Sequence, residues 1–205
     1  MKTIVDIFLS PGEAMDSLAE RPRFLAALIL VVAASMAVTA VANQRGVLEH
    51  SIRAELENNP SMEQIPAEQR EQITERAVNL GVKFSWIGGL ATALIVLLAS
   101  GIFLLLAYAL AGGGVRFAQM FAVVTHAWLP AALQHLISIP ILLAKDPEMV
   151  DVKNVVSMAN LSPLFSPTEQ KKLYAVASSL DLFSFWVIAL LTVGIGQIFS
   201  SGGRL

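Results

Sequence analysis

Four stretches of the chain are almost free of charged residues, and each is long enough to cross a membrane as a helix. They cover residues 24–42, 84–111, 117–144 and 182–199. About 20 helical residues cross a hydrocarbon core that is about 30 Å thick. Because unpaired backbone groups are very costly in lipid, each stretch should be helical. The sequence therefore predicts an all-α fold, a polytopic transmembrane bundle with about four spanning helices.

Composition excludes several classes of function. Only 15% of the 205 residues are charged, against roughly 25% in soluble domains. The formal net charge of −2 offers no electrostatic attraction for nucleic acid. The sequence has no cysteine, which excludes disulfides, thiolate zinc sites and cysteine nucleophiles.

The first span has an alternative interpretation as a cleaved signal peptide. Ala40-Val41-Ala42 resembles a signal-peptidase site that follows an apolar stretch. Signal peptides usually begin with a short cationic region, whereas residues 1–23 are long and partly acidic. The acidic residues are Asp6, Glu13, Asp16 and Glu20. We therefore interpret residues 24–42 as a span that is retained.

Residues 1–23 have the pattern of an N-terminal amphipathic segment at the membrane interface. Ile4, Ile7 and Phe8 fall on one helical face. Ser10-Pro11-Gly12-Glu13 has the features of a helix start, with a capping serine, a proline in the first turn and a glutamate that can reach back. We expect this segment to lie in the headgroup plane.

Residues 43–83 form a charged loop with the pattern of a helical hairpin. Apolar residues recur at helical spacing in two runs. Asn58-Asn59-Pro60 separates the two runs, and Pro66 opens the second run. The runs contain Leu48, Ile52 and Leu56, and then Ile73, Ala77 and Leu80. The glutamates here could bind a cation or a basic partner, but a solvated helix face is the favoured interpretation. They are Glu55, Glu57, Glu63, Glu68, Glu71 and Glu75.

Residues 145–181 form a second loop, in which a capped helix is expected. Asp146, Glu148 and Asp151 do not have the spacing of a calcium-binding loop. Ser166-Pro167-Thr168-Glu169 has a capping signature and predicts a helix that runs toward the fourth span. Residues 200–205 follow that span as a C-terminal tail.

The short connections carry the orientation signal. Gly112-Gly113-Gly114 lacks the lysine and hydroxyl of a phosphate-binding loop and is interpreted as a helix-stop turn between two antiparallel spans. Arg21, Arg23 and Arg116 lie in the short segments, where the positive-inside rule is most reliable. They place the N-terminus in the cytoplasm, although the long loops contain more basic residues in total.

The third span is the most polar of the four and contains a candidate intramembrane polar site. Its members are Gln119, His126, Gln134 and His135. Polar groups inside a bilayer are costly and suggest function, so a proton relay or metal site is one interpretation. The favoured alternative is a set of neutral groups that hydrogen-bond between helices.

The two histidines of this span are poorly spaced for a shared metal ion. His135 is nine residues after His126, which is about half a turn around a regular helix. Pro130 lies between them and could bend the helix enough to change this relation. The sequence also lacks a metal-protease signature and a nucleotide loop, so it predicts no enzyme, no cofactor and no metal.

Four local patterns, in order along the chain, resemble the Yip family of multispanning membrane proteins (Ypt-interacting proteins) in its bacterial branch. The first is Phe8-Leu9-Ser10-Pro11 with Ala14 and Arg21-Pro22. The second is Gly112-Gly113-Gly114-Val115-Arg116-Phe117, followed by His126-Ala127-Trp128-Leu129-Pro130. The third is Leu161-Ser162-Pro163-Leu164. The fourth is Leu180-Asp181-Leu182-Phe183-Ser184-Phe185-Trp186 with Gly194 and Gly196.

The resemblance implies an all-helical membrane bundle without catalytic residues. Eukaryotic relatives bind small GTPases and one another in vesicle traffic, and that GTPase role does not carry over to a bacterium. Family members usually have five spans, whereas this sequence shows four and stops at Gly202-Gly203-Arg204-Leu205, where a fifth would begin. Either a fifth span is missing after this point, or this member has four.

These observations predict a non-enzymatic protein of the bacterial inner membrane that assembles with, stabilises or regulates other membrane proteins. Its expected partners are the lipid bilayer and other membrane proteins or a second copy, through Gly88, Gly89, Gly194 and Gly196. The alternative is a small transporter or channel component that uses the polar groups of residues 117–144. An intramembrane enzyme is a third hypothesis, without positive support.

Overall fold

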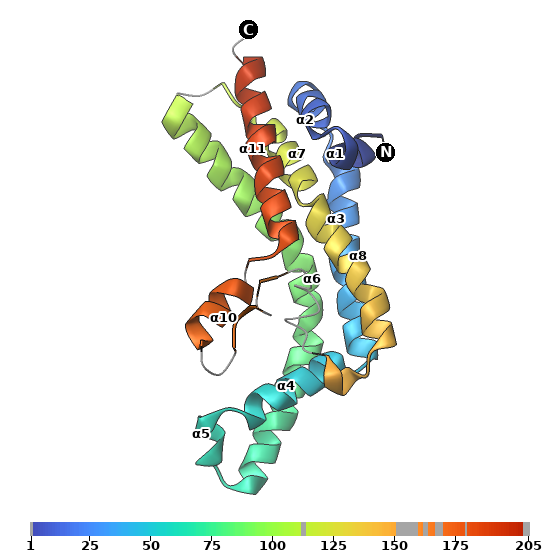
Figure 1. Cartoon of the computed structure of the whole chain (residues 1–205), viewed down its shortest axis with the longest axis vertical. Helices are drawn as coiled ribbons and strands as arrows, with labels where there is room; N and C mark the ends of the chain where they lie inside the picture. Colours follow the sequence, from blue (N-terminus) through green and yellow to red (C-terminus); the bar gives the residue numbers. More distant parts are fainter. Residues whose placement is uncertain are drawn as a thin grey trace.

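A computed structural model describes residues 2–111, 114–150, 160–161, 164–166, 170–178 and 180–202, and they are mostly helical (Figure 1). Within these ranges there is no β-strand, only an isolated bridge between Asn160 and Asp181. The helices are α1 (Lys2–Leu9), α2 (Pro11–Glu20), α3 (Leu25–Gln44), α4 (Val47–Glu57), α5 (Pro60–Glu63), α6 (Ala67–Ala111), α7 (Phe117–Ala127), α8 (Leu129–Ala144), the 3-10 turn η1 (Pro147–Met149), α10 (Lys171–Ser178) and α11 (Leu182–Gly202).

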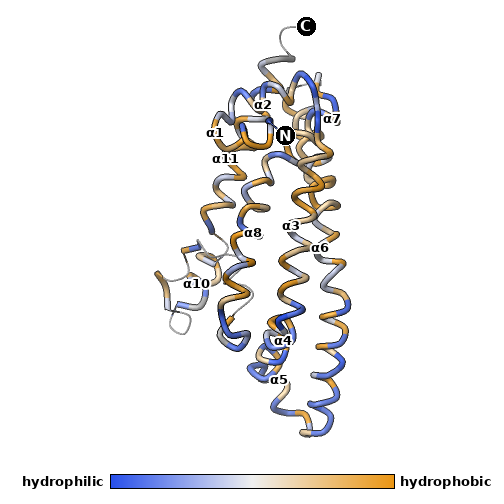
Figure 2. Tube along the Cα trace, turned by 90° about the vertical axis from the view of Figure 1, so that its right-hand side faces the viewer, coloured by the Kyte–Doolittle hydropathy of each residue, from blue (hydrophilic) through white to orange (hydrophobic). Residues whose placement is uncertain are grey.

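Four helical segments are long and apolar enough to cross a membrane, which confirms the predicted fold class. They are α3, α6, the α7–α8 pair and α11. The hydropathy of the trace follows this division: apolar residues dominate the bundle, and polar residues gather at the α4–α5 end (Figure 2). The N-terminal helices α1 and α2 and the last turn of α11 lie at the opposite end (Figure 1).

Helix α6 is one continuous helix of 45 residues, which is about 67 Å long. The helix predicted in the charged loop and the predicted second span are therefore joined without a break. The sequence from Ala67 to Ala111 contains no proline, so nothing removes a backbone donor from the hydrogen-bond ladder. Lys83 is its last charged residue, and Trp86 follows near the expected membrane boundary.

The third span is divided at Trp128 into α7 and α8. Pro130 has no backbone N–H, so it cannot donate to the carbonyl of His126 and the ladder is interrupted there. Helical bonding resumes when the Ala132 N–H donates to the Trp128 carbonyl at 3.1 Å. The bend expected from Pro130 is therefore a short interruption between two helices.

The N-terminal helices are part of the bundle core. Helix α2 packs against α7 and α11, and Ile7, Met15 and Leu18 are fully buried. The ring of Phe8 meets that of Trp186 edge to face, with centroids 5.3 Å apart. One side of α1 remains open, which fits a helix at the membrane interface.

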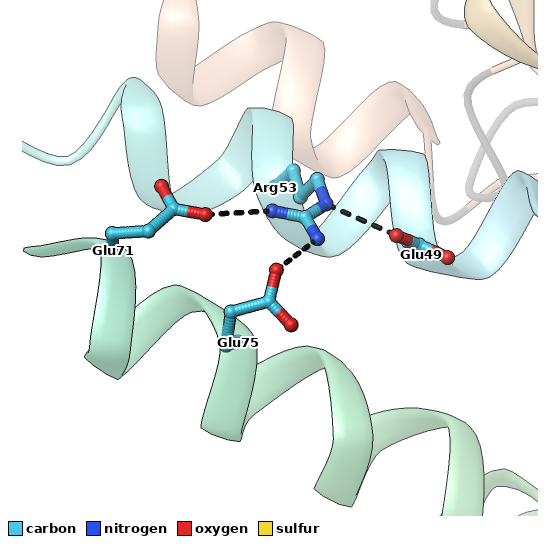
Figure 3. A network of polar contacts seen from close by, with 4 residues as sticks. All are labelled: Glu49, Arg53, Glu71 and Glu75. Carbon is cyan, nitrogen blue, oxygen red and sulfur yellow. Dashed lines mark hydrogen bonds and ion pairs between the residues drawn. The ribbon is translucent and has the colours of Figure 1, made fainter.

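A hairpin formed by α4, α5 and the first part of α6, residues 47–83, extends beyond the spans (Figure 1). Arg53 of α4 lies between three carboxylates: Nη2 is 2.6 Å from Glu75, Nε is 3.1 Å from Glu49 and Nη1 is 3.7 Å from Glu71 (Figure 3). The hydrogen bonds to Glu75 and Glu49 raise the pKa of Arg53 above its ordinary value. Two of these acids belong to α6, so Arg53 links the arms of the hairpin.

We expect Arg53→Leu to loosen this hairpin, because it removes the cation that three acidic side chains share. Limited proteolysis in detergent should cleave the residues between α4 and α6 a few-fold faster, since cleavage follows the population of the open form. High salt should accelerate cleavage of the native protein in the same direction by screening the ion pairs. Arg70→Leu is the matched control, because Arg70 bonds only to the nearby Ile65 carbonyl among the contacts described; equal acceleration by both variants would contradict the role of Arg53.

We also expect Gly194→Leu to destabilise the bundle by about 1–3 kcal/mol through overpacking. A Cβ at Gly194 would overlap Val123 of α7 and lie 2.9 Å from Met15 Sδ of α2, whereas a Cβ at Gly196 would meet nothing within 4 Å. Thermal unfolding in detergent measures the difference. Gly196→Leu is the control and should unfold at or above the native temperature.

Candidate functional site

A cavity of about 240 Å³ lies between α3, α4, α6 and α8. Its walls are mostly apolar, and five polar side chains reach it. They are Ser35, Thr39 and Asn43 of α3, Ser85 of α6 and His135 of α8. Asn43 is near the end of α3 and Leu48 belongs to α4, so the cavity lies toward the hairpin side of the bundle.

Most of the polar groups around the cavity are hydrogen-bonded across or along helices. Ser35 Oγ and Thr92 Oγ1 are 3.1 Å apart and connect α3 to α6. Asn43 Nδ2 donates to Ser85 Oγ at 2.8 Å, which connects the same two helices about two turns further along. Ser85 Oγ in turn donates to the Val82 carbonyl at 2.7 Å. These bonds fix the walls of the cavity.

Two buried atoms at the cavity have no hydrogen-bond partner among the described residues. They are Oδ1 of Asn43 and Nδ1 of His135. A buried polar atom without a partner carries a desolvation cost of about 1–3 kcal/mol. An amide oxygen accepts, and a neutral imidazole offers one donor and one acceptor. The lining residues carry no carboxylate or ammonium group, so the cavity fits water or an uncharged molecule with a hydroxyl or amide group.

The structure places the four polar residues predicted in the third span in different surroundings. Gln119 Nε2 donates to the Ala19 carbonyl at 2.6 Å, and its Oε1 accepts from the Arg116 N–H at 3.0 Å. His126 is buried in the core, where Nδ1 donates to the Ala122 carbonyl at 2.9 Å. Gln119 thus caps α7 and ties it to α2, and His126 bonds within its own helix.

Gln134 and His135 both belong to α8 but face different parts of the bundle. Gln134 is buried, and its main-chain carbonyl accepts a 2.9 Å bond from Ser138 Oγ. His135 is half-buried and lines the cavity against α3 and α6. Of the four predicted residues, His135 is therefore the one that contributes to this cavity.

The described residues contain no group of three or more His, Asp or Glu side chains arranged to hold a metal ion. Some of the loop residues that the sequence analysis named lie outside this part of the chain. Asp151 and the capping residues Pro167, Thr168 and Glu169 lie outside the described residues, as do Gly112 and Gly113. Asp181 caps α11 by accepting from the Phe183 and Ser184 N–H groups at 2.9 and 3.0 Å.

The polar cavity residues of α3 and α6 were not singled out in the sequence, although a signal was present. Ser35, Thr39 and Asn43 follow one another at intervals of four, which puts them on one face of the first span. Thr92 and Ser85 are seven residues apart and share a face of the second span. Two polar faces in separate spans predict interhelical hydrogen bonds, but not which spans are neighbours.

The fold and the polar cavity define a polytopic helical membrane protein whose spans are joined by hydrogen bonds within the bilayer. A family model for the Yip1 domain matches residues 5–204, nearly the whole chain, and the protein belongs to this family. No curated protein and no solved structure matches it. The family is not known for enzymatic activity.

We expect the Ser35–Thr92 contact to couple α3 and α6 by about 0.6 kcal/mol, and by no more than about 1.7, as for other hydrogen bonds inside membranes. A double-mutant cycle with Ser35→Ala and Thr92→Val, followed by unfolding in mixed micelles, measures this coupling. Thr192→Val in place of Thr92→Val is the control pair. Thr192 Oγ1 bonds to the Ile188 carbonyl of its own helix, so that cycle should give a coupling near zero.

Proposed function

We propose that this Yip1-family protein assembles with other membrane proteins and stabilises or regulates them, without catalysing a reaction. One observation carries the proposal: α6 keeps large apolar side chains exposed on both sides of the membrane boundary. Leu94, Leu98 and Leu105 are exposed at lipid level, and Ile73 and Leu80 are exposed in the hairpin. Lipid covers the first group, whereas apolar side chains grouped along a helix outside the bilayer are typical of a protein interface.

The small residues that the sequence suggested as an interface divide into two pairs. Gly89 lies against the Met36 side chain, and Gly194 lies against Val123 and Met15, so both serve contacts inside the bundle. Gly88 and Gly196 have open space around them, which at Gly88 belongs to the cavity. A partner helix could approach closely at Gly196.

The experiment that tests assembly is purification of the tagged protein from its native membrane in a mild detergent. The expected result is a second membrane protein, or a second copy, in a fixed ratio to the tagged chain. Leu80→Asp should reduce that ratio while expression stays constant, because it places a charge in the exposed apolar group of the hairpin. A protein that is purified as a homogeneous monomer would count against the proposal.

We further propose that the N-terminus lies in the cytoplasm of a bacterial cell and that the hairpin projects on the other side of the inner membrane. The short segments with Arg21, Arg23 and Arg116 support this orientation. Since the sequence has no cysteine, single cysteines can report it.

Ser61→Cys in α5 should react with a membrane-impermeant maleimide in intact spheroplasts. Ser17→Cys in α2 should react only after the membrane is opened. Both serines are exposed, so a difference in labelling reports the side of the membrane and not burial. The reverse pattern would place the N-terminus outside.

The second candidate function is transport, and one observation favours it: His135 lines the cavity with a buried nitrogen that has no partner among the described residues. This hypothesis predicts pH-dependent flux through reconstituted protein. His135→Ala should abolish the flux, while Gln119→Ala should leave it unchanged because Gln119 ties α7 to α2 away from the cavity. Proteoliposomes that pass no candidate ion or solute would count heavily against transport.

A further inference from the structure

Two basic residues lie at the hairpin end of the cavity. Arg45 directly follows α3, and Lys145 directly follows α8. Each comes three residues after a residue that lines the cavity, Ala42 in α3 and Leu142 in α8, and therefore shares its side of the helix. Arg45 Nη2 donates to the Lys145 carbonyl at 3.0 Å, which holds the ends of the two helices together.

The guanidinium group of Arg45 has no counter-charge among the described residues. Arg45 is half-buried, and its Nε is buried without a hydrogen-bond partner in this part of the chain. The ion pairs within the described ranges all involve Arg53, and the exposed acids Asp146 and Glu148 form none with Arg45 or Lys145. A half-buried cation without a counter-charge is costly. Its planar fork of N–H donors matches a phosphate group.

The start of α4 favours an anion at the same place. Helix α4 begins at Val47, two residues after Arg45, and no side chain caps its first N–H groups. Leu48 of this first turn lines the cavity. The acid of the turn, Glu49, is paired with Arg53 at 3.1 Å. Because free N–H groups at a helix start attract negative charge, the hairpin end of the cavity is suited to an anion.

Beyond this end, the cavity runs along the spans between mostly apolar walls. Its lining on α3 extends from Asn43 to Ser35, which is about 12 Å along the helix axis. Val38 of α3 and Leu142 of α8 line it and belong to one apolar cluster. Gly88 of α6 adds open space to it. None of the lining residues is charged, so this part suits an uncharged apolar chain.

We propose that the cavity binds an anionic phospholipid, with its phosphate at Arg45 and Lys145 and one acyl chain along the apolar walls. A soluble anion would leave the apolar walls unfilled, and an uncharged lipid would leave both cations unpaired. Asn43 Oδ1, which has no partner among the described residues, lies at the cation end and would accept from a hydroxyl group of the headgroup. Basic groups between membrane helices are typical sites for anionic headgroups.

Lipid titration of the purified full chain in a mild detergent tests this site. The probe is phosphatidylglycerol. The comparisons are phosphatidylcholine with the same acyl chains and inorganic phosphate. Native mass spectrometry counts the bound lipid molecules, and the rise of the unfolding temperature with lipid concentration gives the apparent affinity. Phosphatidylglycerol should bind once per chain and at least about tenfold more tightly than phosphatidylcholine. Inorganic phosphate should not raise the unfolding temperature.

Two charge variants test the headgroup end. Arg45→Gln and Lys145→Gln should each weaken the binding of phosphatidylglycerol about fivefold. Lys145 is exposed, so its variant should fold even if Arg45→Gln does not. Lys83→Gln is the matched control, because Lys83 is also exposed and lies two residues before the lining residue Ser85. That spacing turns Lys83 about 200° away from the cavity, and its variant should bind as the native protein does.

Gly88→Leu tests the acyl-chain part of the site. A Cβ at Gly88 meets nothing within 4 Å, so the leucine should fill part of the cavity without unfolding the bundle. It should lower the affinity for phosphatidylglycerol at least about tenfold, because it displaces buried methylene groups of the chain. Gly196→Leu is the control. Gly196 also has open space around it but does not line the cavity, so this variant should bind as the native protein does.

The outcomes separate this inference from the assembly proposal, on which it does not depend. Absence of bound lipid, equal affinity for the two lipids, or equal losses in Lys145→Gln and Lys83→Gln overturns the headgroup site. Stabilisation by inorganic phosphate to the same extent overturns the assignment to a lipid. Native affinity in Gly88→Leu overturns the place of the acyl chain. Losses in Lys145→Gln and Gly88→Leu with native binding in both controls support the site. Assembly with another membrane protein is tested separately by purification from the native membrane.

Discussion

The unbroken hydrogen-bond ladder of α6 is the constraint on which the rest of the structure depends. Inside a bilayer, a helix must satisfy its backbone groups internally, because no water replaces a missing bond. Helix α6 does so for 45 residues, and α3, α4 and α7 all pack against it. The third span contains a proline where α6 has none, and there the ladder is interrupted at Trp128. The bundle thus combines one rigid rod with one divided span.

The N-terminal helices close the end of the bundle opposite to the hairpin. Helix α2 can approach α11 closely because Gly194 has no side chain, and Gln119 adds a hydrogen bond from α7 to the end of α2. Apolar packing and a hydrogen bond therefore both hold the short helix α2 in place. The cavity lies toward the other end, where α3, α6 and α8 are connected by hydroxyl and amide groups. The two ends of the molecule use different kinds of contact.

The fold class could be predicted from the sequence because charge-free stretches of this length have few alternatives in water or in lipid. The continuity of α6 was less visible, since the change from charged to apolar composition at Lys83 marks a change of solvent and not an end of the helix. The cavity could not be predicted, because it depends on which spans are neighbours. His135 was recognised as a polar residue within a span, but only the packing of α8 on α3 places it beside Asn43 and Ser85.

Helix α6 connects the hairpin directly to the apolar part of the bundle, because both belong to one continuous helix. Residues 67–83, which include all its charged residues, account for about 26 Å of the rod, and the uncharged residues 84–111 account for about 42 Å. Helix α6 contains no proline at which it could bend, and the ion pairs of Arg53 with Glu71 and Glu75 link α4 to its first part. Because one continuous helix forms both parts, a contact that reorients the hairpin would also reorient the apolar part of α6.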